Sequence, residues 1–115
     1  MSDQCLFCKI VAGDIPATIV AESERTLAFR DLNPAAPTHV LVIPREHQPN
    51  AAALAAADPQ ALAEMHTQAG VVAESEGIAG SGYRCVYNTG RDASQTVFHV
   101  HLHVLGGRAM SWPPG

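Results

Sequence analysis

The spacing of apolar positions predicts one long helix in the middle of the chain. Apolar residues recur every three or four positions, at Leu62, Met65, Ala69, Val72 and Ala73. Asp58 is a suitable N-cap for this helix, Pro59 suits its first position, and Gly77 is a natural stop. A shorter helix is expected over residues 7–12, ending at Gly13.

Short β-branched and apolar runs between turn residues predict the strands of a sheet. These runs occupy residues 19–21, 26–30, 38–43, 83–87 and 97–105. Strands come before and after the long helix instead of alternating with helices, so the order favours the α+β class with an antiparallel sheet. A loop is expected over residues 88–96, and a tail with little structure of its own over residues 106–115.

Length and composition are those of one globular domain. The chain has 115 residues, 47% hydrophobic and 16% charged, so we expect a single domain over residues 1–115. A formal net charge of −4 does not favour a nucleic-acid partner. No apolar segment reaches the roughly 20 residues that span a bilayer, so no membrane partner is expected. Residues 1–4 show no signal-peptide pattern, and the expected location is the cytoplasm.

The main candidate for chemistry is the run His99-Val100-His101-Leu102-His103. Alternate side chains of a strand share a face, so the three histidines are expected on one side and the aliphatic residues on the core side. Neighbouring imidazolium ions repel one another, which favours the neutral imidazole that a nucleophile or a metal ligand requires. Two alternatives stay open, a solvated polar strand face and a metal site built from the run itself.

Two cysteines near the N-terminus, Cys5 and Cys8, form a C-x-x-C pair. In a reducing compartment this spacing indicates metal binding or redox chemistry before a structural disulfide. A tetrahedral zinc ion would need two further ligands, and a thioredoxin-like role is disfavoured because no βαβ pattern surrounds the pair. Cys85 falls within a predicted strand and is expected to be a buried thiol.

The histidine run and four other motifs resemble one known family. Residues 99–105 follow the pattern H-φ-H-φ-H-φ-φ, with φ apolar, of the histidine-triad superfamily. The other motifs resemble its Hint branch, the histidine-triad nucleotide-binding proteins, and are Asp31-Leu32-Asn33-Pro34, Pro37-Thr38-His39-Val40-Leu41-Val42-Ile43-Pro44, Asn88-Thr89-Gly90 and Gly106-Gly107-Arg108-Ala109-Met110-Ser111-Trp112-Pro113-Pro114-Gly115. The resemblance implies the histidine-triad fold, a five-stranded antiparallel sheet with one long and one short helix. In a homodimer this sheet would extend to ten strands.

The same resemblance implies hydrolysis of the P–N bond of purine nucleoside 5′-phosphoramidates, with release of AMP. His101 would be the nucleophile that forms a nucleotidyl-histidine intermediate, which water then hydrolyses. His99 and His103 would complete the triad, and His39 would lie beside it and support it.

Nucleotide contacts are also implied by the resemblance. Asp31 would bond the ribose hydroxyls and Leu32 would contact the base, although a turn acid and a core leucine are the ordinary alternatives. The phosphate would be held by Asn88, Gln95, Thr96 and His103. Thr96 stands where serine is common in the branch, so its methyl group is expected to change leaving-group preference while activity persists.

The resemblance further implies one structural zinc ion per chain, held by Cys5, Cys8, His47 and His99. A site closed by four protein ligands stabilises the fold and leaves no open position for catalysis. His99 would then support His101 instead of contacting phosphate. The alternative is that both cysteines are ordinary small residues at a frayed end.

In Hint-like homodimers the long helix and a strand form the interface, and the tail reaches the partner's site, so Trp112 would tune the leaving-group pocket there. Without the resemblance, the four residues from Trp112 onward suggest only a floppy terminus.

Other function classes stay open. Dinucleoside polyphosphate hydrolases share the triad but do not typically end in this tryptophan-proline pattern. Nucleotidyltransferases of the hexose-phosphate type usually carry glutamine at the position of His103. A non-catalytic nucleotide-binding or partner-binding module would keep Asp31 but would not need His101.

Overall fold

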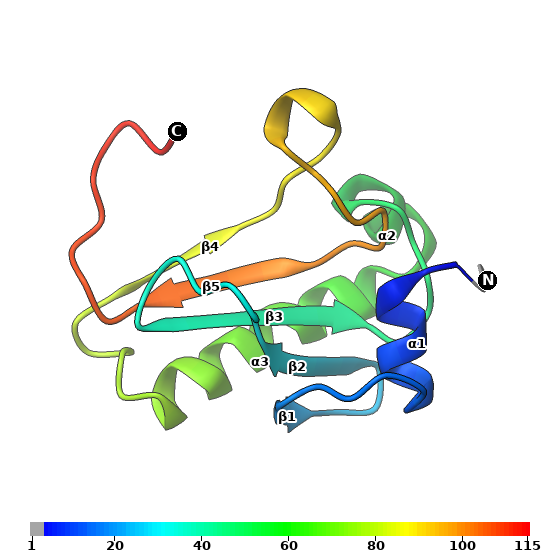
Figure 1. Ribbon diagram of the computed structural model, residues 1–115, viewed down its shortest axis with the longest axis horizontal. Coiled ribbons are helices and arrows are strands. Elements are labelled where there is room, and N and C mark those ends of the chain that lie inside the picture. Colours follow the sequence, from blue (N-terminus) through cyan, green and yellow to red (C-terminus); the bar gives the residue numbers. More distant parts are fainter. Residues whose placement is uncertain (1–3) are drawn as a thin grey trace.

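A five-stranded antiparallel sheet organises the chain, of which the computed structural model describes residues 4–115 (Figure 1). The strands are β1 (Ile19–Glu22), β2 (Thr26–Arg30), β3 (Thr38–Pro44), β4 (Tyr83–Val86) and β5 (Leu102–Gly106). Their spatial order is β1-β2-β3-β5-β4, and every neighbouring pair is antiparallel. The predicted α+β class is confirmed. Residues 1–3 of the segment searched for a signal peptide lie outside the described part.

Within residues 4–115, three α-helices accompany the sheet, where the sequence predicted two. They are α1 (Leu6–Ala12), α2 (Ala51–Ala57) and α3 (Pro59–Ser75), and a short 3₁₀ turn covers Arg91–Ala93. The predicted cap of α3 is confirmed, because the Asp58 side chain accepts a hydrogen bond from the Ala61 amide. None of the helices described is both long and apolar enough to cross a membrane.

The helix that the sequence missed, α2, is almost entirely alanine. Its residues show no contrast between an apolar and a polar face, so periodicity could not reveal it. The Asn50 side chain starts it by accepting a hydrogen bond from the Ala53 amide, and Leu54 anchors it in the core.

The two faces of the sheet are covered differently. Figure 1 shows α3 running along the back of the sheet and α1 lying across the front at one end. The core behind the sheet joins aliphatic side chains of the central strands to α3, among them Val40, Val42, Leu102, Val104, Met65 and Val72. The smaller front core is Phe7, Leu27, Phe29, Leu41 and Ile43. Because α1 covers only part of the front face, the remainder is open for a site.

The histidine run leaves the sheet earlier than the sequence predicted. The expected strand over 97–105 is wrong in its first half, since β5 begins at Leu102, residues 97–99 form bends and residues 100–101 are irregular. The Val100 amide donates to the Gln48 carbonyl, in the loop after β3, at 2.8 Å. The expected alternation nevertheless holds, because Val100 packs in the rear core while His99 and His101 contact Phe7 in the front core.

The thiol of Cys85 is exposed, so the expectation of a buried thiol is wrong. Cys85 lies on β4, and β4 is at the edge of the sheet. An edge strand pairs on one side only, and a strand pattern in the sequence does not distinguish an edge from a centre.

Candidate active site and metal centre

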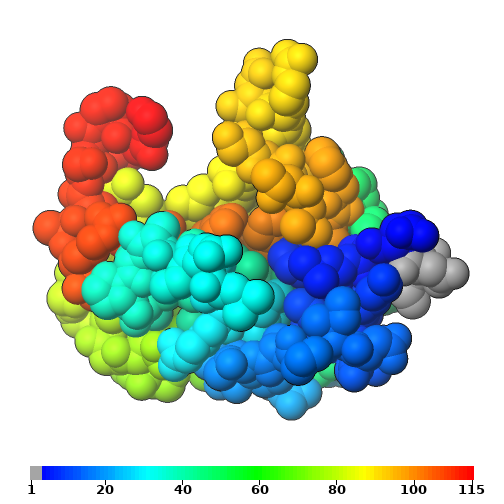
Figure 2. All heavy atoms as spheres, in the orientation of Figure 1, coloured from blue at the N-terminus to red at the C-terminus, as the bar shows by residue number. Residues whose placement is uncertain are grey.

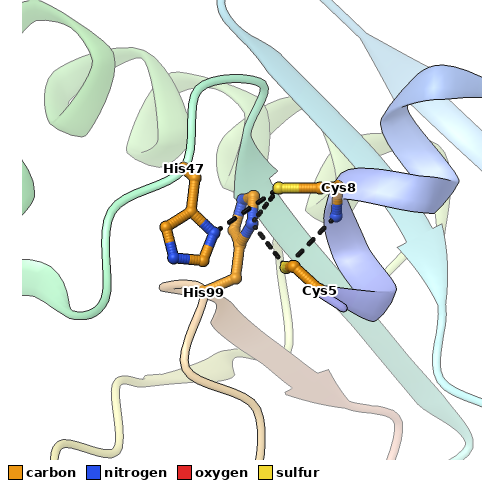
Figure 3. A group of neighbouring side chains, drawn as sticks. All are labelled: Cys5, Cys8, His47 and His99. Atoms are coloured by element: carbon orange, nitrogen blue, oxygen red, sulfur yellow. Dashed lines mark hydrogen bonds between the residues drawn. The ribbon is translucent and has the colours of Figure 1, made fainter. Parts of the chain in front are cut away.

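Two cysteines and two histidines from distant parts of the chain meet at the N-terminal end of α1 (Figure 3). Cys5 caps the helix, Cys8 lies in its first turn, His47 follows β3, and His99 precedes β5. Their ligand atoms all lie within 4.8 Å of one another. We call these four residues the cysteine–histidine cluster.

The hydrogen bonds of His99 orient it as a metal ligand. Its Nε2 lies 2.8 Å from the Pro44 carbonyl oxygen, which can only accept, so Nε2 carries the proton. Its Nδ1 therefore offers a lone pair, and it lies 3.4 Å from the Cys5 sulfur and 3.5 Å from the Cys8 sulfur. A metal-bound histidine usually donates its other N–H in this way. Burial also lowers the pKa of His99 to about 4, which keeps the ring neutral.

The spacing of the cluster suits zinc. Sulfur and nitrogen atoms bound to one tetrahedral zinc ion lie about 3.6 Å apart, from the usual bond lengths. In addition to the two His99 distances, the Nδ1 of His47 lies 3.4 Å from the Cys8 sulfur. Two thiolates and two neutral imidazoles are a common donor set for structural zinc, so the residues present fit this ion.

His101 is held in one tautomer by the backbone of His99. Its Nδ1 lies 2.9 Å from the His99 carbonyl oxygen, so Nδ1 donates and Nε2 keeps its lone pair. The ring of Phe7 meets the His101 ring edge-on, with centroids 5.1 Å apart. A neutral imidazole with a fixed lone pair is a competent nucleophile.

A second cluster lies on the same face of the sheet, further along β3 and β5. It consists of Asp31, His39 and His103, whose ligand atoms also lie within 4.8 Å of one another, and we call it the acid–histidine cluster. His39 Nε2 is 2.9 Å from His103 Nδ1 and 3.5 Å from Asp31 Oδ2. Burial lowers the pKa of His103 to about 4 and also lowers the pKa of His39.

A cavity of about 320 Å³ opens on the front face beside the acid–histidine cluster and His101. Its apolar wall includes Phe7, Ile10, Phe29, Leu32, Leu41 and Val97. Its polar lining includes Asp31, Thr96, His101 and His103. An apolar wall beside a few converging polar groups is the usual form of a small-molecule site.

Gln95 does not offer its side chain to this cavity. Its amide nitrogen donates to the carbonyl oxygens of Pro49 at 2.7 Å and Val97 at 3.1 Å. Its oxygen accepts from the Gly90 amide at 2.9 Å. The Gln95 backbone amide also donates, to the Gly90 carbonyl oxygen at 3.0 Å. Both the side chain and the backbone N–H of Gln95 therefore stabilise the loop over residues 88–96 and do not face a phosphate.

Two other expected nucleotide contacts also lie away from the cavity lining. Asn88 is not among the described residues that form its wall. Trp112 is 80% exposed on the C-terminal tail, where the Arg84 guanidinium lies 6.0 Å from its ring centroid. Within one chain, neither residue completes the site.

Sequence reasoning missed the groups that hold the histidines in place. Phe7 contacts both His99 and His101, and the only signal for it was the apolar pattern of a short helix. The carbonyls of Pro44 and His99, and the Ala35 amide that donates to His39, are backbone groups and leave no signal in residue type.

These features define a histidine-based site in a small α+β fold, and comparison with known proteins identifies its class. The chain belongs to the HIT domain family, whose model matches residues 12–110. It is 44% identical to the purine nucleoside phosphoramidase of Escherichia coli, over 96% of this chain and 92% of that one.

Further relatives extend the comparison. The 14 kDa zinc-binding protein of Zea mays is 47% identical, over 96% of this chain and 87% of that one. A HIT family hydrolase from Legionella pneumophila superposes with a TM-score of 0.93 at 48% identity, covering 97% of this chain and 100% of that chain.

Proposed function

We propose that this protein is a hydrolase that cleaves the P–N bond of purine nucleoside 5′-phosphoramidates and releases AMP. The observation that carries the proposal is the tautomer of His101, whose Nε2 lone pair is left free in a cavity that also exposes Asp31 and His103. The similarity to the phosphoramidase of Escherichia coli supports the substrate class.

The reaction takes two displacements at the α-phosphorus. Nε2 of His101 attacks and forms a P–N bond to the ring, while the P–N bond to the leaving amine breaks and the amine takes up a proton from solvent. Water then attacks the nucleotidyl-histidine, and its hydroxide stays on phosphorus as part of AMP. The P–N bond to the ring breaks in the same step, its electron pair returns to Nε2 of His101, and the remaining proton of the water returns to solvent. The His99 carbonyl stabilises the positive ring that exists between the two steps.

The nucleotide would lie along the cavity with its base on the apolar wall near Leu32 and Phe29. Asp31 would accept hydrogen bonds from the ribose hydroxyls. The phosphate would be held by the Thr96 hydroxyl, by His103 and, after movement of the loop over residues 88–96, by Gln95 and Asn88. These assignments follow the lining of the cavity and the family resemblance.

The cysteine–histidine cluster would hold one zinc ion per chain. When bound, zinc supplies structural cross-linking at four ligands and no open coordination position. His99 connects this centre to the nucleophile, because its ring faces the sulfurs while its carbonyl accepts from His101. Thiolate ligands persist in a reducing compartment, so a cytoplasmic location fits the centre.

A homodimer formed across β4 would complete the site. The strand lies at the edge of the sheet with Tyr83 and Cys85 exposed, and Val71 on α3 is exposed as well. Figure 2 shows a hollow between the C-terminal tail and the loop that follows β4, both of which project on that side. A second copy seated there would continue the sheet to ten strands and bring Trp112 toward its partner's cavity. Sedimentation at micromolar concentration tests this, since a monomer would contradict it.

The decisive experiment measures turnover of adenosine phosphoramidate and of a dinucleoside polyphosphate by the protein and by His101→Ala. We expect rapid release of AMP from the phosphoramidate, slow or no cleavage of the polyphosphate, and a loss of at least about 1,000-fold in the variant. Preferential cleavage of the polyphosphate would indicate the other hydrolase class. AMP binding without turnover of either compound would indicate a binding module.

A further inference from the structure

One carboxylate behind the sheet bonds both ends of the loop that begins with Asp31. This loop covers residues 31–37, between β2 and β3, and Figure 1 shows it in cyan. Arg30, the last residue of β2, donates two hydrogen bonds of 2.8 Å to the two carboxylate oxygens of Glu76. The hydroxyl of Thr38, the first residue of β3, donates to the same carboxylate at 3.4 Å. Glu76 thus holds the residue before the loop and the residue after it.

Arg30 and Asp31 face opposite sides of the sheet. Arg30 is paired with Val40, whose side chain lies in the rear core, so the Arg30 side chain is directed toward α3. Glu76 follows α3 directly and is its C-cap. Successive residues of an extended chain alternate, and Asp31 accordingly faces the front, where it lines the cavity. The ion pair therefore fixes, from behind, the backbone from which Asp31 reaches the cavity.

The geometry of this ion pair suits it to hold a backbone position. Two parallel N–H···O bonds between a guanidinium and a carboxylate restrict orientation as well as distance. Most exposed ion pairs contribute little, but bidentate arginine pairs are an exception, and here the Glu76 side chain is only 17% exposed. The Arg30 guanidinium also lowers the pKa of Glu76, so the carboxylate is charged at neutral pH.

The second half of the loop has restraints of its own. The Arg108 guanidinium donates to the Ala35 carbonyl oxygen at 3.0 and 3.3 Å, and the Ala35 amide donates to the His39 ring. The first half is different, because Leu32 is 92% exposed and gains little support from packing. The position of Asp31 therefore depends mainly on Arg30, its neighbour along the chain.

We propose that Glu76 is a positioning residue that acts through Arg30 and Thr38 to hold Asp31 at the right distance from the ribose of the nucleotide. A carboxylate that is already in place binds the two ribose hydroxyls without the entropy cost of ordering its loop. This inference rests on the proposed function for the identity of the ligand as a ribonucleotide.

The direct test compares AMP with 2′,3′-dideoxyadenosine 5′-monophosphate, which lacks both ribose hydroxyls. Glu76→Gln should raise the Kd for AMP by about 3-fold to 10-fold, which is part of what hydrogen bonds to the Asp31 carboxylate contribute. The Kd for the dideoxy nucleotide should change by less than about 2-fold, because Asp31 has no hydroxyl to bind there. Calorimetric titration measures both constants. Equal losses for the two nucleotides, or no loss for either, would overturn the inference.

Arg30→Gln separates the effect of position from the effect of charge. It breaks the same ion pair but removes a positive charge, whereas Glu76→Gln removes a negative one. An electrostatic effect on the phosphate would change AMP affinity in opposite directions in the two variants. Loss of position should weaken AMP binding in both variants, and either change should add little to the effect of Asp31→Asn. Opposite changes in affinity, or losses that add fully to that of Asp31→Asn, would refute the positioning role.

Glu64, on α3, supplies the matched control. Its carboxylate accepts hydrogen bonds from Ser23 and from the backbone and side chain of Arg25, at the opposite end of β2. Glu64→Gln should lower the thermal midpoint about as much as Glu76→Gln and leave the ratio of the two Kd values unchanged. The same change of ratio in Glu64→Gln would mean that any lost contact between α3 and the sheet disturbs the site, which contradicts the inference.

Failure of the proposed function would look different. A parent protein that binds AMP but cleaves no phosphoramidate would refute the proposed function, while the ratio of the Kd values would still decide this inference. A parent protein that cleaves phosphoramidates, with equal losses for both nucleotides in Glu76→Gln, would refute this inference alone.

Discussion

The two clusters both contain a pair of histidines, but one pair offers lone pairs to a cation and the other offers an N–H as a hydrogen-bond donor. In the cysteine–histidine cluster, the outer nitrogen of His99 meets a carbonyl, so the inner nitrogen offers a lone pair to a cation. In the acid–histidine cluster, the outer nitrogen of His39 meets an amide, so the inner nitrogen offers a proton. The backbone partner of the outer nitrogen, and not the residue type, therefore decides whether a histidine binds a metal or donates a hydrogen bond.

The largest effect is expected from breaking the cysteine–histidine cluster. Cys8→Ser should reduce zinc from one ion per chain to none, because serine is a poor zinc ligand, and should lower the free energy of unfolding by more than about 3 kcal/mol. Elemental analysis and urea unfolding measure the two quantities. Cys85→Ser is the matched control and should keep its zinc. Full zinc occupancy in a Cys5→Ser, Cys8→Ser double variant would contradict the assignment.

A substitution in the acid–histidine cluster should weaken nucleotide binding and leave the zinc content unchanged. Asp31→Asn should leave the zinc content unchanged but weaken AMP binding by about 10-fold to 100-fold, since hydrogen bonds to a charged group contribute about 1.5–3 kcal/mol. Calorimetric titration with AMP measures the affinity. Loss of metal from this variant would show that the distinction between the two clusters is wrong.

Lowering the pH should reduce the free energy of unfolding, because His103 is neutral in the folded protein. The pKa of His103 is lowered to about 4 from the ordinary value of 6.5. Between these values the unfolded chain binds a proton that the folded chain does not, so this contribution to stability is complete above pH 6.5 and is lost as the pH falls toward 4. Between pH 7 and pH 5, the free energy of unfolding of the parent protein should fall by about 1–2 kcal/mol more than that of His103→Asn. Urea unfolding at the two pH values measures this difference. Equal losses would mean that His103 is protonated in the folded protein.

The smallest effect is expected at the edge of the cavity, where Thr96 contributes to the lining but belongs to neither cluster. Thr96→Ser keeps the hydroxyl and removes a methyl group, so relative kcat/KM values for phosphoramidates of different amines should shift by a few-fold, with activity retained. An unchanged order of leaving groups would show that the methyl group has no role in specificity.

Local signals in the sequence were sufficient for most of the fold. Asp58, Pro59 and Gly77 determine where α3 begins and ends, and these residues act through contacts within a few positions along the chain. The alanines of α2 show no contrast between a polar and an apolar face. The irregular segment over residues 97–101 is held at Val100 by a hydrogen bond to Gln48, which is far away in sequence. The family resemblance indicated the four residues of the cysteine–histidine cluster and placed His39 beside the triad, but it did not place Asp31 against His39. The tautomers depend on carbonyl and amide groups that only the folded backbone positions.

The cysteine–histidine cluster also ties residues separated by 94 positions, Cys5 and His99. Closing so long a segment costs several kcal/mol of chain entropy in an unstructured polypeptide. The pairing of β3 with β5 brings His99 close to the strand that precedes His47, so the folded sheet already meets part of that cost. We therefore expect metal capture to follow the pairing of these strands, and the bound ion to hold α1 against a sheet that is already formed.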